Sequence, residues 1–114
     1  DGRHGYQLHV CQLRPESRGT IRLKSADPLA APAIDPNYLS APEDVETLLR
    51  GVEMARDIGR QAAFAPYNDG EAWPGPDVTD RATLLEKMRG WAETIYHPVG
   101  TCRMGVDDRA VVDG

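Results

Sequence analysis

Apolar side chains occupy every second position in two stretches near the start of the chain, and this predicts two strands. In residues 6–11 and again in residues 20–24, apolar and polar positions alternate, which is the period of a half-buried strand. Between them, residues 15–19 (Pro-Glu-Ser-Arg-Gly) have the composition of a turn. We therefore expect an antiparallel hairpin over residues 6–24.

Prolines mark the next segment as a connection. Pro28, Pro32 and Pro36 each lack the backbone donor that a central strand needs. We expect an extended connection here, or an edge strand at best, in which residues 33–35 (Ala-Ile-Asp) are the only plausible strand.

A first amphipathic helix is predicted from about residue 40 onward. Ser40 and Glu43 have the spacing of a capping box, and Pro42 falls in the first turn, where a missing donor costs nothing. Helical spacing then relates the apolar residues Val45, Leu48, Leu49, Val52 and Ala55. The pattern fades near Ala62.

A second helix is predicted after an irregular loop over residues 64–78, which is rich in proline and glycine. Asp80 has the position of an N-cap. The apolar stripe that follows consists of Leu84, Leu85, Met88, Trp91, Ala92 and Ile95. Because the residue before a proline disfavours the helical conformation, we expect Pro98 to stop this helix and His97 to lie just past its end.

The order of these elements predicts the fold class. Strands and helices are grouped rather than alternating, which favours an α+β fold over a doubly wound sheet. We expect an antiparallel sheet with helices packed against it, and long loops rich in proline and glycine between them. The 114 residues suit a single domain.

Charge and hydropathy exclude two classes of partner. The net charge of −5, with no run of Lys or Arg, argues against binding to nucleic acid. No apolar stretch approaches the roughly 20 residues that a membrane helix needs, so we predict no membrane span.

Candidate chemistry gathers in residues 96–105, Tyr-His-Pro-Val-Gly-Thr-Cys-Arg-Met-Gly. Two glycines in this segment permit close approach of the backbone to a flat ligand, and Pro98 stiffens the residue after His97. Imidazole can take up a proton near neutral pH. The residues alone describe a rigid loop that presents a base, although a single loop histidine is more often without a function. We expect Arg103 to form a structural ion pair rather than to bind an anion.

Other reactive residues carry weaker signals. Cys11 and Cys102 lie far apart without metal-type spacing, so we expect two reduced thiols in partly buried positions. Cys102 follows His97 by five residues and could be a nucleophile, but such a thiol needs an adjacent base and an orienting group, and we favour a packing role. His4 and His9 show no ligand spacing, and we predict no metal site.

Three motifs resemble one known family. Residues 96–105 look like the histidine-containing signature of the glucose–methanol–choline (GMC) oxidoreductases. Residues 15–28 resemble that family's P-x-S-R-G-x-[IV]-x-L hairpin, and residues 34–39 (Ile-Asp-Pro-Asn-Tyr-Leu), followed by a capped helix, match it as well. The resemblance runs from Tyr6 to Val112, with the motifs in the expected order.

The resemblance implies a cofactor and roles for individual residues. In this family a flavin, FAD, accepts hydride from an alcohol carbon, and the residue matching His97 is the general base on the alcohol oxygen. Val99, Gly100 and Thr101 would pack against the flavin. Tyr96 would line the substrate pocket, or it would pack against tryptophans of the domain, and the sequence leaves these two roles open.

The resemblance also implies that the chain is part of a larger enzyme. Residues 1–114 correspond to part of a C-terminal, substrate-binding domain, and they contain no G-x-G-x-x-G fingerprint of a Rossmann domain that binds FAD. A second catalytic His or Asn is expected beyond the signature. We expect the FAD-binding domain of the parent chain and a small alcohol, of choline or aliphatic type, as partners. The isolated piece is expected to be inactive. We expect the parent enzyme in the cytoplasm, with membrane association as an alternative.

Two rival functions remain from the sequence alone. The chain could be a non-catalytic binding or dimerisation module that keeps the domain's fold, and a homo-oligomer is open in either case. A free-standing module should hide its apolar surface, whereas a piece of a larger protein should expose a patch of it. A hydrolase that uses Cys102 and a histidine is the third hypothesis.

Overall fold

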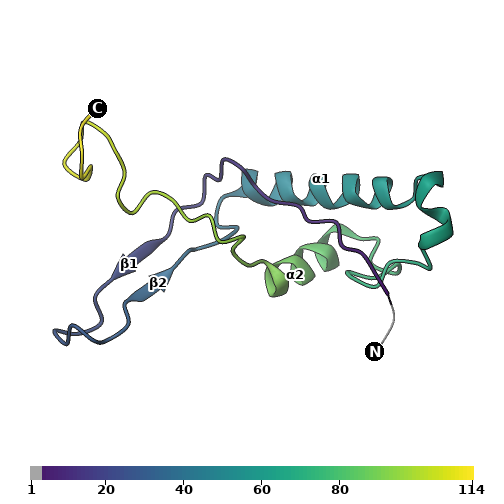
Figure 1. Cartoon of the computed structure of the whole chain (residues 1–114), viewed down its shortest axis with the longest axis horizontal. Coiled ribbons are helices and arrows are strands. Elements are labelled where there is room, and N and C mark those ends of the chain that lie inside the picture. Colours follow the sequence, from purple (N-terminus) through teal and green to yellow (C-terminus); the bar gives the residue numbers. More distant parts are fainter. Residues whose placement is uncertain (1–3) are drawn as a thin grey trace. The chain divides into compact units, whose positions relative to one another are not determined.

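The structure is a computed structural model that describes residues 4–114. Its elements, in chain order, are the strands β1 (Thr20–Arg22) and β2 (Ala33–Asp35), helix α1 (Pro42–Gly59), the 3-10 helix η1 (Ala62–Tyr67) and helix α2 (Arg81–Trp91) (Figure 1). Helices and a two-stranded antiparallel sheet in one chain agree with the α+β class. None of the helices in the described range is long and apolar enough to cross a membrane.

The described residues form two units. The helical unit comprises residues 4–18 and 37–92, and the loop unit comprises residues 19–36 and 93–114. The packing of the helices on the sheet, which was expected from the sequence, stays a prediction.

Helix α1 begins one residue later than its capping box requires. Its N-cap is Ala41, which has no side-chain cap, and Pro42 is the first helical residue. The predicted Ser40–Glu43 capping box is therefore wrong. The backbone N–H of Ala41 instead donates to Ser17 Oγ at 3.0 Å. A hydroxyl from a distant segment therefore accepts a hydrogen bond from the N-cap residue. The helix ends at Gly59, before the predicted end near Ala62.

The first predicted strand is absent, because residues 6–10 have no strand partner. This segment is extended and follows α1 (Figure 1). A Cβ built on Gly51 of α1 would lie 2.2 Å from Val10 Cγ1, and one on Gly59 would lie 3.9 Å from the Tyr6 hydroxyl. Glycines of α1 therefore leave room for the segment. Alternate residues contact the helix, which explains the alternating pattern without a sheet.

The core of the helical unit lies between its two helices. Four side chains form the buried cluster, Leu49, Val78, Leu84 and Met88. Asp80 caps α2 as predicted, since its side chain accepts a hydrogen bond from Thr83 N at 2.9 Å. Part of the predicted loop over residues 64–78 is wrong, because η1 extends to Tyr67.

Helix α2 ends earlier than the sequence pattern predicted. Its last helical residue is Trp91, and Ala92 is the C-cap in an extended conformation. The β-branched residues Thr94 and Ile95, which have lower helix propensity, lie beyond the helix. The expectation that His97 follows directly on the helix end is therefore wrong, because five residues separate His97 from Trp91.

The sheet of the loop unit is a short hairpin with a different partner from the predicted one. Strand β1 pairs with β2 in antiparallel register, with Ile21 opposite Ile34. Residues 33–35, expected within an extended connection or at best an edge strand, thus take the place of residues 6–11 in the hairpin. At its base, a Cβ on Gly19 would lie only 2.1 Å from the carbonyl oxygen of Asp35. Glycine is required there because the two backbones approach so closely.

Candidate functional site

The loop that carries the signature begins with a strained turn. Tyr96 has a φ of 64°, a left-handed conformation that residues with a Cβ rarely adopt. Its backbone N–H donates to Thr94 Oγ1 at 2.9 Å, a local side-chain to backbone bond of the kind that stabilises turns. The Tyr96 side chain is 83% exposed. The reversal at Tyr96 sets the direction in which the next residue, His97, leaves the chain.

His97 is exposed, and one of its ring nitrogens is already engaged. Nδ1 lies 2.5 Å from the carbonyl oxygen of Ile95. A carbonyl oxygen only accepts hydrogen bonds, so Nδ1 must carry the proton of the neutral ring. Nε2 then keeps a lone pair, and within residues 4–114 it has no hydrogen-bond partner. In this tautomer the ring can accept a proton at Nε2.

The residues after His97 are exposed. Val99 is 90% exposed, although it is apolar. Gly100 has a φ of 104°, and outside its chain neighbours no described atom lies within 4 Å of the place where a Cβ would be. Thr101 is exposed as well. An uncovered valine beside a backbone without a Cβ suits a flat apolar ring, so these residues fit the cofactor that the resemblance implies.

The segment after the signature closes on itself. Gly105 N donates to the carbonyl oxygen of Val112 at 3.0 Å, and Val111 N donates to that of Arg103 at 3.1 Å. Arg103 also forms an ion pair with Asp107, as predicted. The side-chain hydrogen bond from Arg103 is the largest of the effects that hold the pKa of Asp107 below its ordinary value. This small ring anchors the C-terminal end of the signature loop.

Side chains and backbone groups of residues 15–19 form hydrogen bonds that hold the chain together. Ser17 Oγ accepts from Ala41 N, as described above. Arg18 Nη1 folds back and donates to the carbonyl oxygen of Pro15 at 2.6 Å. Asn37 Nδ2 donates to the carbonyl oxygen of Arg18 at 2.9 Å. These bonds join two segments of the helical unit that are about twenty residues apart in sequence.

Asp44 is an ionisable residue that the sequence analysis missed. Its side chain is 2% exposed and accepts three hydrogen bonds, from Gln12 Nε2 at 3.1 Å, Glu16 N at 2.9 Å and Ser17 N at 2.8 Å. Burial alone would raise the pKa of Asp44, but hydrogen bonds from Ser17, Glu16 and Gln12 outweigh it and lower the pKa from 3.8 to about 2. Nothing in the local sequence distinguishes Asp44 from Glu43, since only the tertiary fold brings the donors to it.

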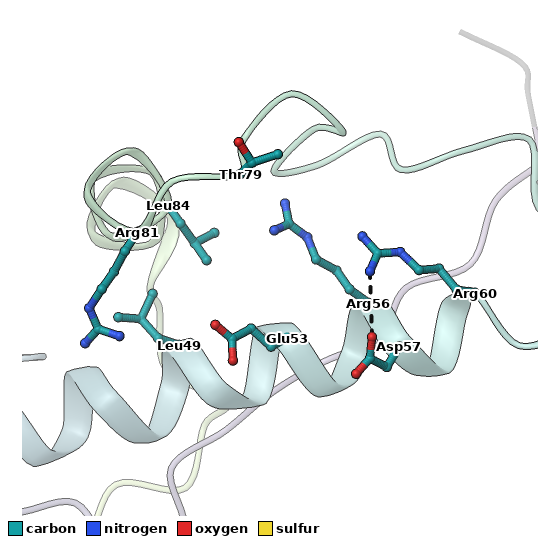
Figure 2. Close-up of a pocket in the computed structure, with 8 residues that line it drawn as sticks. All are labelled: Leu49, Glu53, Arg56, Asp57, Arg60, Thr79, Arg81 and Leu84. Atoms are coloured by element: carbon teal, nitrogen blue, oxygen red, sulfur yellow. Dashed lines mark ion pairs between the residues drawn. The ribbon is translucent and has the colours of Figure 1, made fainter.

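A pocket of about 450 Å³ lies in the helical unit (Figure 2). Its lining consists of Leu49, Glu53, Arg56, Asp57, Arg60, Thr79, Arg81 and Leu84. The three arginines face carboxylates: Arg56 pairs with Glu71, Arg60 with Asp57, and Arg81 with Glu46. Because each guanidinium is already paired, this pocket offers no surplus positive charge to an anionic ligand, and we assign it no function.

The two cysteines are free but not partly buried. Cys11 and Cys102 are both exposed, so the expectation of partial burial is wrong. The packing role predicted for Cys102 has no support within the described chain, because its side chain is uncovered. The predicted site residues, Tyr96, His97, Val99, Gly100 and Thr101, are held together on one loop by their closeness in sequence.

Comparison with known proteins gives consistent matches over most of the chain. A family model described as GMC oxidoreductase matches residues 15–114. An alcohol dehydrogenase [acceptor] from Pseudomonas putida is 52% identical over 110 residues, which are 96% of this chain and 20% of the relative. An oxygen-dependent choline dehydrogenase from Klebsiella pneumoniae (strain 342) is 46% identical over 111 residues, which are 97% of this chain and 20% of the relative.

A solved structure supports the fold. The crystal structure of pyridoxine 4-oxidase from Mesorbium loti matches with a TM-score of 0.79 and 36% sequence identity, over 87% of this chain and 19% of that chain. The chain thus spans about a fifth of the length of the proteins it matches.

Proposed function

The chain belongs to the GMC oxidoreductase family, and we propose that it is the substrate-domain segment of a longer FAD-dependent alcohol dehydrogenase or oxidase, with His97 as its general base. The observation that carries this proposal is the state of the His97 ring. Its Nδ1 proton is engaged by the Ile95 carbonyl, and its Nε2 lone pair faces no partner in the described chain. A base needs this combination of a fixed orientation and an available lone pair.

The chemistry assigned to the chain is the movement of one proton. The hydroxyl hydrogen of the alcohol passes to His97 Nε2, which places electron density on the oxygen and weakens the C–H bond beside it. The chemistry that FAD would supply is acceptance of the hydride from that carbon, which would convert the alcohol to a carbonyl compound. The Nδ1 bond to Ile95 keeps the ring in place while Nε2 becomes protonated, since both nitrogens of the imidazolium can donate.

The neighbouring residues receive supporting roles. Val99 and Gly100 offer an uncovered apolar surface and a backbone without a Cβ, and we assign them and Thr101 to flavin contact. Tyr96, which is exposed next to the base, is assigned to the substrate side. The substrate class is a small alcohol of aliphatic or choline type, which is supported by the names of the two relatives.

The partner is the remainder of the parent protein, including a domain that binds FAD. Large apolar side chains of both units are uncovered, among them Leu13, Leu29, Val99 and Val106, which are between 83% and 102% exposed. The stronger support for a missing partner is length, since the relatives are about five times longer than the chain. We accordingly expect the 114-residue chain alone to turn over no alcohol.

The test replaces His97 in the full-length protein that carries this sequence. His97→Ala and His97→Asn should each lower kcat/KM for an alcohol by roughly 10²–10⁴-fold, the usual contribution of a positioned base. The flavin absorption spectrum should be unchanged, because the base does not hold the cofactor. His9→Asn is the matched control, since His9 is exposed and its Nε2 lies 3.1 Å from Oε1 of Gln7, two residues earlier. Near-native turnover by His97→Ala would refute the assignment.

A further inference from the structure

The His97 ring follows directly on a turn at Tyr96. Tyr96 precedes it in the left-handed conformation, which is unfavourable for a tyrosine. The side chain of Tyr96 is mostly exposed, so its own packing does not hold this conformation. Two hydrogen bonds lie on the turn, one from Tyr96 N–H to the hydroxyl of Thr94 and one between His97 Nδ1 and the carbonyl oxygen of Ile95.

Thr94 is built into this turn in a way that suits a fixed support. It is half-buried, whereas Ile95, Tyr96 and His97 are exposed. Its Oγ1 lies 2.9 Å from Tyr96 N, and only a residue with a short side-chain oxygen can reach a backbone donor two positions later. Valine has the same shape without the hydroxyl, and serine keeps the hydroxyl without the methyl group. Substitution by valine or by serine therefore separates the effect of the Thr94 hydroxyl from that of its shape.

We propose that Thr94 is a positioning residue that fixes the tautomer of His97. With Tyr96 held in the left-handed turn, His97 Nδ1 reaches back to the carbonyl oxygen of Ile95 and keeps its proton there. The hydrogen bonds of the two ring nitrogens decide which of them carries the proton of the neutral imidazole. Loss of the turn removes the Ile95 contact and lets the proton occupy Nε2, where it abolishes the lone pair that accepts the alcohol proton.

The catalytic consequence rests on the proposed function of His97, but the control of the tautomer does not. Only the molecules with the proton on Nδ1 are competent as a base. The value of kcat should therefore fall in proportion to the fraction of this tautomer that remains, while KM should change little. A role of Thr94 in stability alone would leave the tautomer of the folded protein unchanged.

The experiment measures the tautomer directly by NMR. The full-length protein is labelled with ¹⁵N-histidine, and the two ring nitrogens of His97 are identified by their absence in His97→Gln. We expect a single tautomer with the proton on Nδ1 in the native protein and in Thr94→Ser. In Thr94→Val we expect a mixture of tautomers and a several-fold lower kcat. Thr47→Val, at an exposed position of α1, is the matched control.

A second variant guards against a folding defect. Glycine adopts positive φ values readily, so Tyr96→Gly added to Thr94→Val should restore the Nδ1 tautomer without restoring the hydroxyl. Retention of the Nδ1 tautomer by a folded Thr94→Val variant overturns the proposal. Full activity of His97→Ala would instead refute the proposed function, while the NMR result would still decide the role of Thr94.

Discussion

The buried carboxylate of Asp44 leads to a quantitative prediction about stability and pH. It accepts hydrogen bonds from Gln12, Glu16 and Ser17, and these hold residues 12–17 against the first turn of α1. Asn in place of Asp44 keeps the shape but turns one acceptor into a donor, which then faces an N–H group. We expect Asp44→Asn to lose at least one of these hydrogen bonds and the favourable charge.

The magnitude follows from the pKa of Asp44, which is lowered from 3.8 to about 2 in the folded protein. At roughly 1.4 kcal/mol per pKa unit, ionisation of Asp44 contributes about 2 kcal/mol to the free energy of unfolding at neutral pH. Because the folded pKa is the lower one, this contribution is fully present above about pH 5. It declines as the pH falls through about 4 and is lost below about 2.

The assay is urea denaturation followed by far-UV circular dichroism at a series of pH values, for the native chain and for Asp44→Asn. The variant should be less stable by about 2 kcal/mol near neutral pH, and the difference should shrink steadily toward pH 2. Asp57→Asn is the matched control, because its carboxylate is exposed on the same helix and its pair with Arg60 is also exposed. A stability difference that stays constant from neutral pH to pH 2 would show that the hydrogen bonds do not act through the charge of Asp44.

Two substitutions test other parts of the fold. Gly19→Ala places a Cβ 2.1 Å from the Asp35 carbonyl oxygen, so the amides of β1 and β2 should lose protection from hydrogen exchange. Gly5→Ala, whose Cβ would have no described atom within 4 Å, should leave that protection unchanged. Equal protection in both variants would contradict the close approach. Leu49→Ala empties a site that is 1% exposed and should lower the free energy of unfolding by roughly 2–5 kcal/mol in a urea titration, whereas Leu13→Ala at an exposed site should not; a cost below about 1 kcal/mol for Leu49→Ala would argue against a core at this place.

The parts of the fold that the sequence predicted are those with local causes. Pro42 at the first position of α1 and the cap at Asp80 depend on residues within one helical turn, and both occur as predicted. Residues 33–35, the only plausible strand of the proline-rich segment, do form one, and the prolines on either side delimit it. A local pattern is sufficient wherever the backbone groups that it satisfies lie within a few residues.

The errors come from contacts between distant segments. Alternation in residues 6–10 predicted a strand, but the pattern arises because an extended chain lies along α1 and alternate residues face Gly51 and Gly59. Similarly, Ser40 was predicted to cap α1, whereas Ser17 supplies the hydroxyl from another part of the chain. Periodicity reports which side chains are covered, and it does not identify what covers them.

The candidate site shows the same division. The signature loop could be located from its residues. The residues around His97 are exposed, which agrees with a site that a further part of the protein completes. The tautomer of His97 could not be predicted, because it depends on the coordinates of the Ile95 carbonyl and on the left-handed turn at Tyr96. The buried carboxylate of Asp44 could not be predicted for the same reason, since its three hydrogen-bond donors are at least 27 residues away in sequence.

The bonds at the base of the hairpin have an evolutionary consequence. Asn37 holds the carbonyl oxygen of Arg18, and Ser17 holds the N–H of Ala41, so the chain leaves the helical unit and returns to it at two points that are tied together. Because the cost of closing a loop grows only slowly with its length, residues 29–32, between the two family motifs, could be lengthened, shortened or exchanged between homologues while the helices keep their packing. This stretch is therefore the natural place for relatives to diverge in length, and for an engineer to graft a new segment.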